Sequence, residues 1–206
     1  MRFLRHQTSP PGDPAGPDDP VDIRAWGPTD LLGHVESAMA IYAEAMGYPP
    51  GAGRAHVSAT ANHATQPGFR AMAALSGERL VGFGYGYASR PGQWWHEQVR
   101  HGLTAEQADF WLTDAYELCE LHVRPPWQGR RIGRALLIGL LDGVADSRHV
   151  LLSTPEGDTR AWRLYRSLHF ADVLRHFYFP TDDRPFAILG AELPLRDDAQ
   201  QNRRDE

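Results

Sequence analysis

A glycine- and arginine-rich turn stands between a predicted strand and a predicted helix at residues 123–136, which read Val-Arg-Pro-Pro-Trp-Gln-Gly-Arg-Arg-Ile-Gly-Arg-Ala-Leu. Such a turn aims several backbone N–H groups and the positive end of a helix at one point. Gly129 and Gly133 let the backbone approach an anion, while Arg130, Arg131 and Arg134 add positive charge. The segment predicts a phosphate-binding site, although an arginine-rich helix start is about as often only a solvated face.

Three alternate glycines, Gly82, Gly84 and Gly86, lie inside a predicted strand and do not open a helix. They are therefore not a dinucleotide-binding loop, and the sequence contains no G-x-x-x-x-G-K-[ST] segment of the kind that binds nucleoside triphosphates. Glycines along one face of a strand instead indicate the close approach of another backbone or of a ligand.

The spacing of histidine and cysteine does not favour metal or thiol chemistry. His96 and His101 are one residue further apart than in the H-E-x-x-H zinc motif, so a helix would place their imidazoles about 140° apart. Cys119 is the only cysteine, so no disulfide forms within the chain. No helix N-terminus or proven cationic neighbour would activate its thiol. We predict no metal site.

The turn resembles the acetyl-CoA-binding motif of the GNAT superfamily of N-acyltransferases, V-x-P-x-x-[QR]-x-x-G-x-[GA]. Val123, Pro125, Gln128 and Gly133 match this motif, and Arg131 stands where the family usually has its first glycine. The resemblance implies that the anion is the pyrophosphate of coenzyme A.

A second segment, residues 158–170, resembles the downstream family motif N-x-x-A-x-x-L-Y-x-x-L-G-F. Asp158 replaces the asparagine and His169 replaces the glycine, while the alanine, leucine, tyrosine and phenylalanine positions agree. Together the two motifs, with the strands around them, cover roughly residues 21–193. Two motifs in the expected order are stronger evidence than either one alone.

The resemblance implies that acetyl-CoA binds as a co-substrate and that a backbone N–H polarises its thioester carbonyl. That donor would come from Leu121, His122 or Val123, and Tyr165 matches the family tyrosine that protonates the departing thiolate. A buried core aromatic is the other interpretation of Tyr165. The residues implied in cofactor binding are these three donors, Tyr165, Gln128, Gly129, Arg130, Arg131, Ile132, Gly133, Arg134 and Asp158.

Two carboxylates on the predicted strand 116–123 are candidates for the general base. Strand alternation places Glu117, Cys119 and Leu121 on one face and Leu118, Glu120 and His122 on the other. Glu117 is the first choice, because some family members carry their base six residues before the valine, and burial would raise the pKa of its carboxyl. Glu120 is the alternative, since a bulge near the strand end would invert the alternation. A solvated or arginine-paired carboxylate is the competing interpretation of either.

These assignments predict an N-acetyltransferase that moves an acetyl group to a primary amine by direct attack in a ternary complex. The acceptor is open: a small or antibiotic-like amine is slightly favoured over a peptide, and the acyl group could be longer than acetyl. Trp94 and Trp95 could wall the acceptor pocket, although packing is the more common role of paired aromatics. The alternative function is a non-catalytic acyl-CoA-binding sensor or regulatory protein.

The elements that must position these residues form an α/β (α+β) pattern. The predicted strands lie at 21–26, 69–75, 79–87, 116–123, 150–152, 170–179 and 186–193, and the predicted helices start near Asp30, Ile132 and Thr159. Residues 53–67 show no clear periodicity, and residues 89–113 form an aromatic-rich insertion. By resemblance, a mixed, mostly antiparallel sheet of six to seven strands is splayed between the strands ending near Val123 and Ser153, with helices on both faces.

Composition limits the remaining classes. The chain has 206 residues, 42% of them hydrophobic, which is enough for one domain spanning residues 21–195. Residues 1–20 and 196–206 have little to bury and are predicted to be mobile tails. A net charge of -5 argues against nucleic acid and anionic membrane as partners. We expect a cytoplasmic protein, and association into a homodimer remains open.

Overall fold

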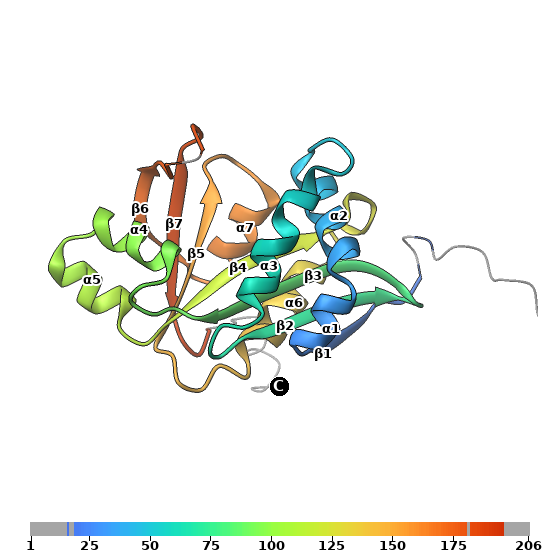
Figure 1. Cartoon of the computed structure of the whole chain (residues 1–206), viewed down its shortest axis with the longest axis horizontal. Helices are drawn as coiled ribbons and strands as arrows, with labels where there is room; N and C mark the ends of the chain where they lie inside the picture. Colours follow the sequence, from blue (N-terminus) through green and yellow to red (C-terminus); the bar gives the residue numbers. More distant parts are fainter. Residues whose placement is uncertain (1–15, 17–18, 181, 196–206) are drawn as a thin grey trace, which may run out of the picture.

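A seven-stranded sheet forms the centre of the computed structural model, which describes residues 16, 19–180 and 182–195 (Figure 1). Its strands are β1 (Asp22–Trp26), β2 (Arg70–Ser76), β3 (Arg79–Ala88), β4 (Ala115–Val123), β5 (His149–Pro155), β6 (Ala171–Phe177) and β7 (Phe186–Glu192). The spatial order is β1-β2-β3-β4-β5-β7-β6, and every neighbouring pair is antiparallel except β4 with β5. The predicted mixed, mostly antiparallel sheet is confirmed.

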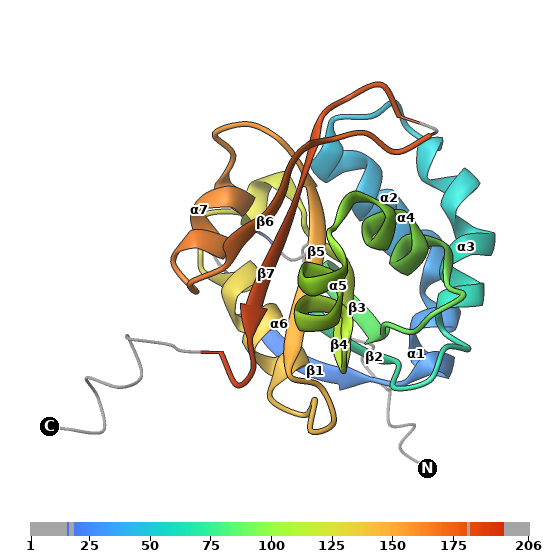
Figure 2. The same cartoon turned by 90° about the vertical axis from the view of Figure 1, so that its left-hand side faces the viewer.

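Helices cover both faces of this sheet, as predicted (Figure 2). One face carries α6 (Ile132–Leu141) and α7 (Arg160–Arg166), and the short helix η2 (Pro125–Trp127) precedes α6. The other face carries α1 (Pro28–Gly33), α2 (Val35–Met46), η1 (Ala52–His56), α3 (Val57–His63), α4 (Trp94–Gly102) and α5 (Ala105–Leu112). In the part of the chain that the structure describes, no helix is long and apolar enough to cross a membrane.

Several local expectations change in detail. The helix expected from Asp30 to about Met46 is two helices, α1 and α2, and the Asp30 carboxylate accepts a hydrogen bond from the Gly27 N–H at 2.9 Å. Residues 53–67 contain most of η1 and all of α3, which has only seven residues and is too short for a clear periodic signal. The predicted mobile tails lie almost entirely outside the described residues.

Three groups of buried apolar side chains fill the two layers. The largest lies between the sheet and helices α6 and α7, and it includes Leu136, Leu140 and Leu168. A second group lies under α1 and α2. The third joins the α4–α5 insertion to strands β5, β6 and β7. The insertion therefore completes the core on a face of the sheet that would otherwise be exposed.

Strands β4 and β5 separate after a short stretch of pairing, which opens the sheet in its middle. Their parallel register has only three residue pairs, Ala115 with His149, Tyr116 with Val150 and Glu117 with Leu151. Beyond Glu117, β4 continues for six residues with β3 as its only neighbour, because β5 turns away to pair with β7. The predicted splay is confirmed, and it leaves the final residues of β4 facing a gap.

A β-bulge at Cys119 changes which side chains of β4 share a face. Tyr85 pairs with Glu120 and Gly86 pairs with Leu118, so Cys119 has no partner on β3. Gly86 permits this because an added Cβ there would lie only 2.2 Å from the carbonyl oxygen of Glu117. The alternate glycines of β3 thus accommodate the backbone of β4, which is one of the two roles that their spacing predicted.

The bulge makes the predicted alternation of β4 wrong beyond Cys119. Leu118 contributes to the core under α6, and Leu121 packs against that same core. Glu120 instead lies opposite Tyr85, which belongs to the core under α1 and α2. Glu117 and Glu120 consequently face the same layer. This is the arrangement expected if a bulge inverted the alternation of the strand.

The insertion is packed tightly enough to test by adding one methyl group. An added Cβ at Gly190 of β7 would lie 2.6 Å from the ring of Trp111 in α5. We predict that Gly190→Ala lowers the free energy of unfolding by about 1–3 kcal/mol through overpacking, measured by urea denaturation. A second substitution, Trp111→Leu, should recover part of that loss.

Gly33→Ala is the matched control, because a Cβ at Gly33 meets no atom within 4 Å. If Gly190→Ala and Gly33→Ala are equally stable, the contact between the insertion and β7 is not as close as the structure has it.

Candidate active site

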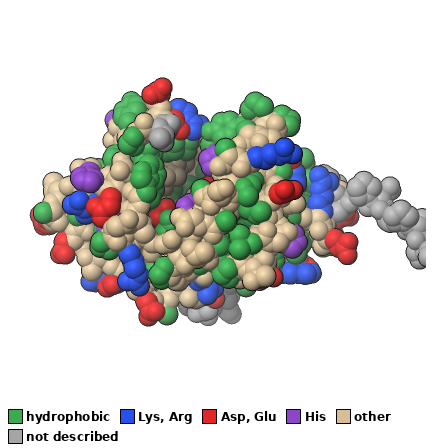
Figure 3. Space-filling model, in the orientation of Figure 1, with side chains coloured by type: hydrophobic (Ala, Val, Ile, Leu, Met, Phe, Trp, Pro, Cys, Tyr) green, Lys and Arg blue, Asp and Glu red, His purple; other side chains and the backbone are tan. Residues whose placement is uncertain are grey.

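The gap between β4 and β5 opens into a cleft with a volume of about 1650 Å³. Its lining includes Leu121 and Val123, which pack toward α6, and also Glu120, which faces the α2 layer. The cleft therefore reaches both faces of the sheet through the splay. On the α2 face, the surface is hollowed between the β6–β7 side of the molecule and the end of α2 (Figure 3).

Most of the predicted cofactor-binding residues come together in this cleft. Arg130 and Asp158 are the exceptions, since neither lines it, and Asp158 is an exposed partner of Arg163 at 2.6 Å. The predicted residues that do line the cleft are Leu121, His122, Val123, Gln128, Gly129, Arg131, Ile132, Gly133, Arg134 and Tyr165.

The cleft also contains residues that the sequence analysis did not single out. Two arginines on α7, Arg160 and Arg163, line the same side as Arg131 and Arg134. The opposite end is lined by Tyr42, Ala45 and Met46 of α2 and by Asp182, Arg184 and Phe186 near the start of β7. The arginines lie within the second motif and could have been found by their helical spacing. The α2 and β7 residues carry no motif, and only the fold brings them here.

The start of α6 has the geometry of an anion site. The first intrahelical hydrogen bond runs from the Ala135 N–H to the Arg131 carbonyl at 3.0 Å, so the amides of Ile132 and Gly133 precede it at the positive end of the helix. Gln128 shapes the turn by donating from Nε2 to the Val123 carbonyl at 2.9 Å. These amides and the four arginines fit a pyrophosphate group.

Both departures from the family glycines occur where the backbone favours glycine. Arg131, the N-cap residue of α6, has φ 62°, and His169, which follows α7, has φ 60°. An L-residue in this left-handed region costs about 1–2 kcal/mol. The two turns therefore keep their conformation although each carries a side chain, and Arg131 places a cation at the helix N-terminus.

Two backbone N–H groups of β4 point into the cleft. The Arg124 N–H donates to the Val81 carbonyl of the neighbouring chain segment at 2.8 Å, and successive residues of a strand direct their polar groups to opposite sides. The N–H of His122 consequently points toward β3, whereas those of Leu121 and Val123 point toward the gap left by β5. Of the three predicted main-chain donors, Leu121 and Val123 have the orientation that a carbonyl in the cleft requires.

Tyr165 and Glu120 reach this cleft from α7 and from β4. Tyr165 is buried, and its ring packs against Phe170 with the centroids 5.5 Å apart. Burial, and after it the negative charge of Glu120, raises the pKa of the Tyr165 phenol well above its ordinary value. The phenol is therefore neutral and able to donate a proton at physiological pH. Glu120 lines the cleft and contacts His122.

Glu117 lies behind the cleft and does not line it. Its side chain is buried, and its Oε2 atom has no hydrogen-bond partner among the described residues. Burial raises the pKa of the Glu117 carboxyl to about 7. This confirms the expected direction of the pKa change, although Glu117 is not among the residues that line the cleft.

The paired tryptophans lie outside the cleft lining as well. Trp95 is buried in the core between the insertion and the C-terminal strands, and its Nε1 donates to the Ser153 hydroxyl at 3.4 Å. Trp94 is half exposed and stacks on Phe179. Trp95 therefore supports β5 from behind, since Ser153 itself lines the cleft.

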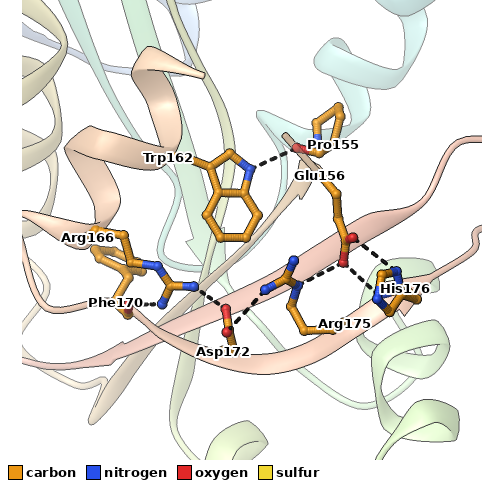
Figure 4. Close-up of polar contacts among 8 residues, drawn as sticks. All are labelled: Pro155, Glu156, Trp162, Arg166, Phe170, Asp172, Arg175 and His176. Atoms are coloured by element: carbon orange, nitrogen blue, oxygen red, sulfur yellow. Dashed lines mark hydrogen bonds and ion pairs between the residues drawn. The ribbon is translucent and has the colours of Figure 1, made fainter. Parts of the chain in front are cut away.

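A polar network holds the far wall of the cleft (Figure 4). Trp162 of α7 donates from Nε1 to the Pro155 carbonyl at the end of β5, at 2.9 Å. The guanidinium groups of Arg166 and Arg175 each lie 5.0 Å from its ring centroid, and Asp172 of β6 pairs with both. These contacts tie β5, α7 and β6 together, on the side of the splay opposite β4.

The left-handed residue after α7 gives a direct test of the second motif. At position 169, alanine would bear the steric cost of positive φ, while glycine bears only its entropic cost of about 0.5–1 kcal/mol. We predict that His169→Gly is more stable than His169→Ala by up to about 1 kcal/mol in urea denaturation. The opposite order would mean that this turn does not adopt the positive φ.

The buried carboxyl predicts a specific pH dependence of stability. Because the pKa of Glu117 is about 7 in the folded protein and near 4 in an unfolded chain, the folded state binds more protons between these values. The free energy of unfolding should therefore fall as pH rises through this window. We predict that Glu117→Gln gains stability relative to wild type on going from pH 5 to pH 8, by roughly 3 kcal/mol.

Urea denaturation of both proteins at the two pH values measures this gain. Glu78→Gln, in the exposed β2–β3 turn, is the control and should show no such change. An equal difference between Glu117→Gln and wild type at both pH values would contradict the raised pKa.

Comparison with known proteins agrees with this geometry. Residues 36–170 match the model of the acetyltransferase (GNAT) family. A GCN5-like protein acetyltransferase of Mycobacterium tuberculosis is 38% identical over 200 residues, covering 82% of this chain and 96% of the relative.

Two solved structures show the same fold at low identity. The PaiA N-acetyltransferase of Thermoplasma acidophilum in complex with coenzyme A has a TM-score of 0.55 at 15% identity, covering 84% of this chain and 99% of that one. The ribosomal-protein-S18-alanine N-acetyltransferase of Escherichia coli has a TM-score of 0.55 at 18% identity, covering 86% and 97%. With its splayed sheet and its arginine-lined anion site, the chain belongs to the GNAT family of acetyl-CoA-dependent acetyltransferases.

Proposed function

We propose that this protein transfers an acetyl group from acetyl-CoA to a primary amine by direct attack in a ternary complex. One observation carries the proposal: the N–H groups of Leu121 and Val123, the phenol of Tyr165 and the carboxylate of Glu120 meet in one cleft that reaches both faces of the sheet. The thioester supplies an activated acetyl group, and the protein supplies orientation and proton transfer.

Each group has one role in this reaction. The N–H groups of Leu121 and Val123 stabilise the negative charge that develops on the carbonyl oxygen. Tyr165 donates its proton to the sulfur as the carbon–sulfur bond breaks. The amine loses a proton on the Glu120 side of the cleft as its nitrogen bonds to the carbonyl carbon. Glu117 does not contact the amine, because it does not line the cleft.

We further propose that the acceptor amine belongs to a protein or peptide. The name of the mycobacterial relative, a protein acetyltransferase, supports this choice over a small amine. The surface hollow on the α2 face supports it too, because it lies open between α2 and the β6–β7 side (Figure 3). Trp95 packs into the core, so it does not enclose a small cavity around the acceptor.

Tyr165→Phe tests the proposed reaction, because it removes the proton donor and keeps the buried ring. We predict a fall in kcat of at least about 100-fold, with an unchanged Kd for coenzyme A. Thiol release from acetyl-CoA should be measured over a panel of lysine peptides, peptides with free N-termini and small primary amines. Faster turnover of the peptides is expected.

Tyr178→Phe, at an exposed tyrosine outside the cleft lining, is the matched control for loss of one phenol hydroxyl. If the wild-type protein binds coenzyme A but releases no thiol with any amine, the proposed reaction is wrong. If only small amines react, the acceptor class is wrong while the reaction stands.

A further inference from the structure

The side chain of His122 forms a close pair with Glu120 on the acceptor side of the cleft. Nε2 of His122 lies 2.5 Å from Oε2 of Glu120, and both residues line the cleft. They are two apart on β4, beyond the bulge at Cys119, and so project from the same face. Without the bulge, this pair would face the core under α6 instead of the α2 layer.

The imidazole is held in place on its other sides. Its ring meets Tyr42 of α2 edge-on with the centroids 5.2 Å apart, and it lies 5.7 Å from the ring of Phe83 on β3. The side chain is only 15% exposed. Since Nε2 is engaged by Glu120, the nitrogen left to accept a proton is Nδ1, which has no hydrogen-bond partner among the described residues.

We propose that His122 is the catalytic base and that Glu120 is the residue that positions it, a role that rests on the proposed acetyl transfer. Nδ1 takes the proton from the attacking amine: one N–H bond of the acceptor breaks, and a new N–H bond forms on the ring. The Nε2 proton stays in its hydrogen bond with Glu120, whose negative charge stabilises the resulting imidazolium.

The surroundings favour a cation at this point. Burial, and after it the charge of Glu120, raises the pKa values of the Tyr42, Tyr85 and Tyr165 phenols above the ordinary range. All three phenols are therefore neutral near pH 7. The ionisable and charged groups around the pair are Tyr42 of α2, His56 of η1, His63 of α3, Tyr85 of β3, Glu117 and Cys119 of β4, Arg124 with its partner Glu44 of α2, Tyr165 of α7 and, beyond Tyr42, Tyr48 and Arg184 with its partner Asp182.

Among these neighbours, burial lowers the pKa of His63 and raises that of Glu117 to about 7. His63 is therefore neutral near pH 7, and Arg184 is compensated by Asp182 at 2.5 Å. The Glu120–His122 pair lines the cleft, whereas His63 and Glu117 do not.

Two isosteric substitutions separate the two roles. Gln at position 122 can still donate to Glu120 but cannot accept the amine proton, so His122→Gln should lower kcat by at least about 100-fold. Glu120→Gln keeps a hydrogen-bond acceptor for Nε2 but removes the charge, so it should lower kcat less, by about 10-fold. Both variants should bind coenzyme A as wild type does, and their KM for the best amine of the panel should change little.

Rescue and pH profiles sharpen the assignment. Exogenous imidazole should restore part of the turnover of His122→Ala but not that of Glu120→Ala, measured as acetylated amine. Because a catalytic base must be unprotonated to act, kcat/KM of the wild type should fall toward acidic pH. This fall should disappear in His122→Gln. The exposed His101→Gln and Glu78→Gln are matched controls that should keep wild-type turnover.

A readout without turnover is the ¹⁵N NMR spectrum of the imidazoles, assigned by comparison with His122→Gln. We expect His122 to carry its proton on Nε2 in wild type and to lose this preference in Glu120→Gln. A proton on Nδ1, turnover of His122→Gln within threefold of wild type, or a larger loss in Glu120→Gln would each overturn the role of His122. A wild type that acetylates no amine would instead overturn the proposed function itself.

Discussion

The separation of β4 from β5 is the constraint on which the rest of the site depends. A parallel pair must stop exchanging hydrogen bonds once its strands diverge, and here the pairing ends at Glu117. The N–H groups of Leu121 and Val123 are left without a strand partner on that side, which would be costly in a closed core. The splay therefore creates both the space for a ligand and the donors that need one. Contacts on both sides hold it open, including β3 on the near side and the Trp162 network on the far side.

Charge is distributed unevenly along this cleft. Toward α6 and α7 the lining includes Arg131, Arg134, Arg160 and Arg163, which suit phosphate groups. Toward α2 it includes Glu120 together with the half-buried phenol of Tyr42, whose pKa is raised by burial and by that carboxylate. The arginine end of the cleft therefore suits the phosphate groups of the cofactor, whereas the end toward α2 carries the carboxylate of Glu120.

The aromatic side chains of the insertion at residues 89–113 serve mainly in packing, which is the more common role of paired aromatics. Its helices α4 and α5 pack on β5, β6 and β7, where Trp111 contacts Gly190 so closely that a methyl group would not fit. Trp95 reaches the cleft only indirectly, through the Ser153 hydroxyl. Large aromatic side chains bury the most apolar area per residue, and in a short two-helix segment that burial is what secures the segment to the sheet.

By itself, the sequence determined which two segments line the cleft, because the turn at 123–136 and the segment 158–170 adopt local backbone geometry that a contiguous stretch specifies. The mixed, mostly antiparallel sheet and its splay also followed from the family resemblance. Only the tertiary structure decided which carboxylate reaches the cleft. The bulge at Cys119 depends on Gly86 of a neighbouring strand. It places Glu120 and His122 on the α2 face of the sheet, whereas simple alternation along β4 would place them on the α6 face. Such a shift leaves no mark in β4 itself, because it arises from contact between residues more than 30 positions apart.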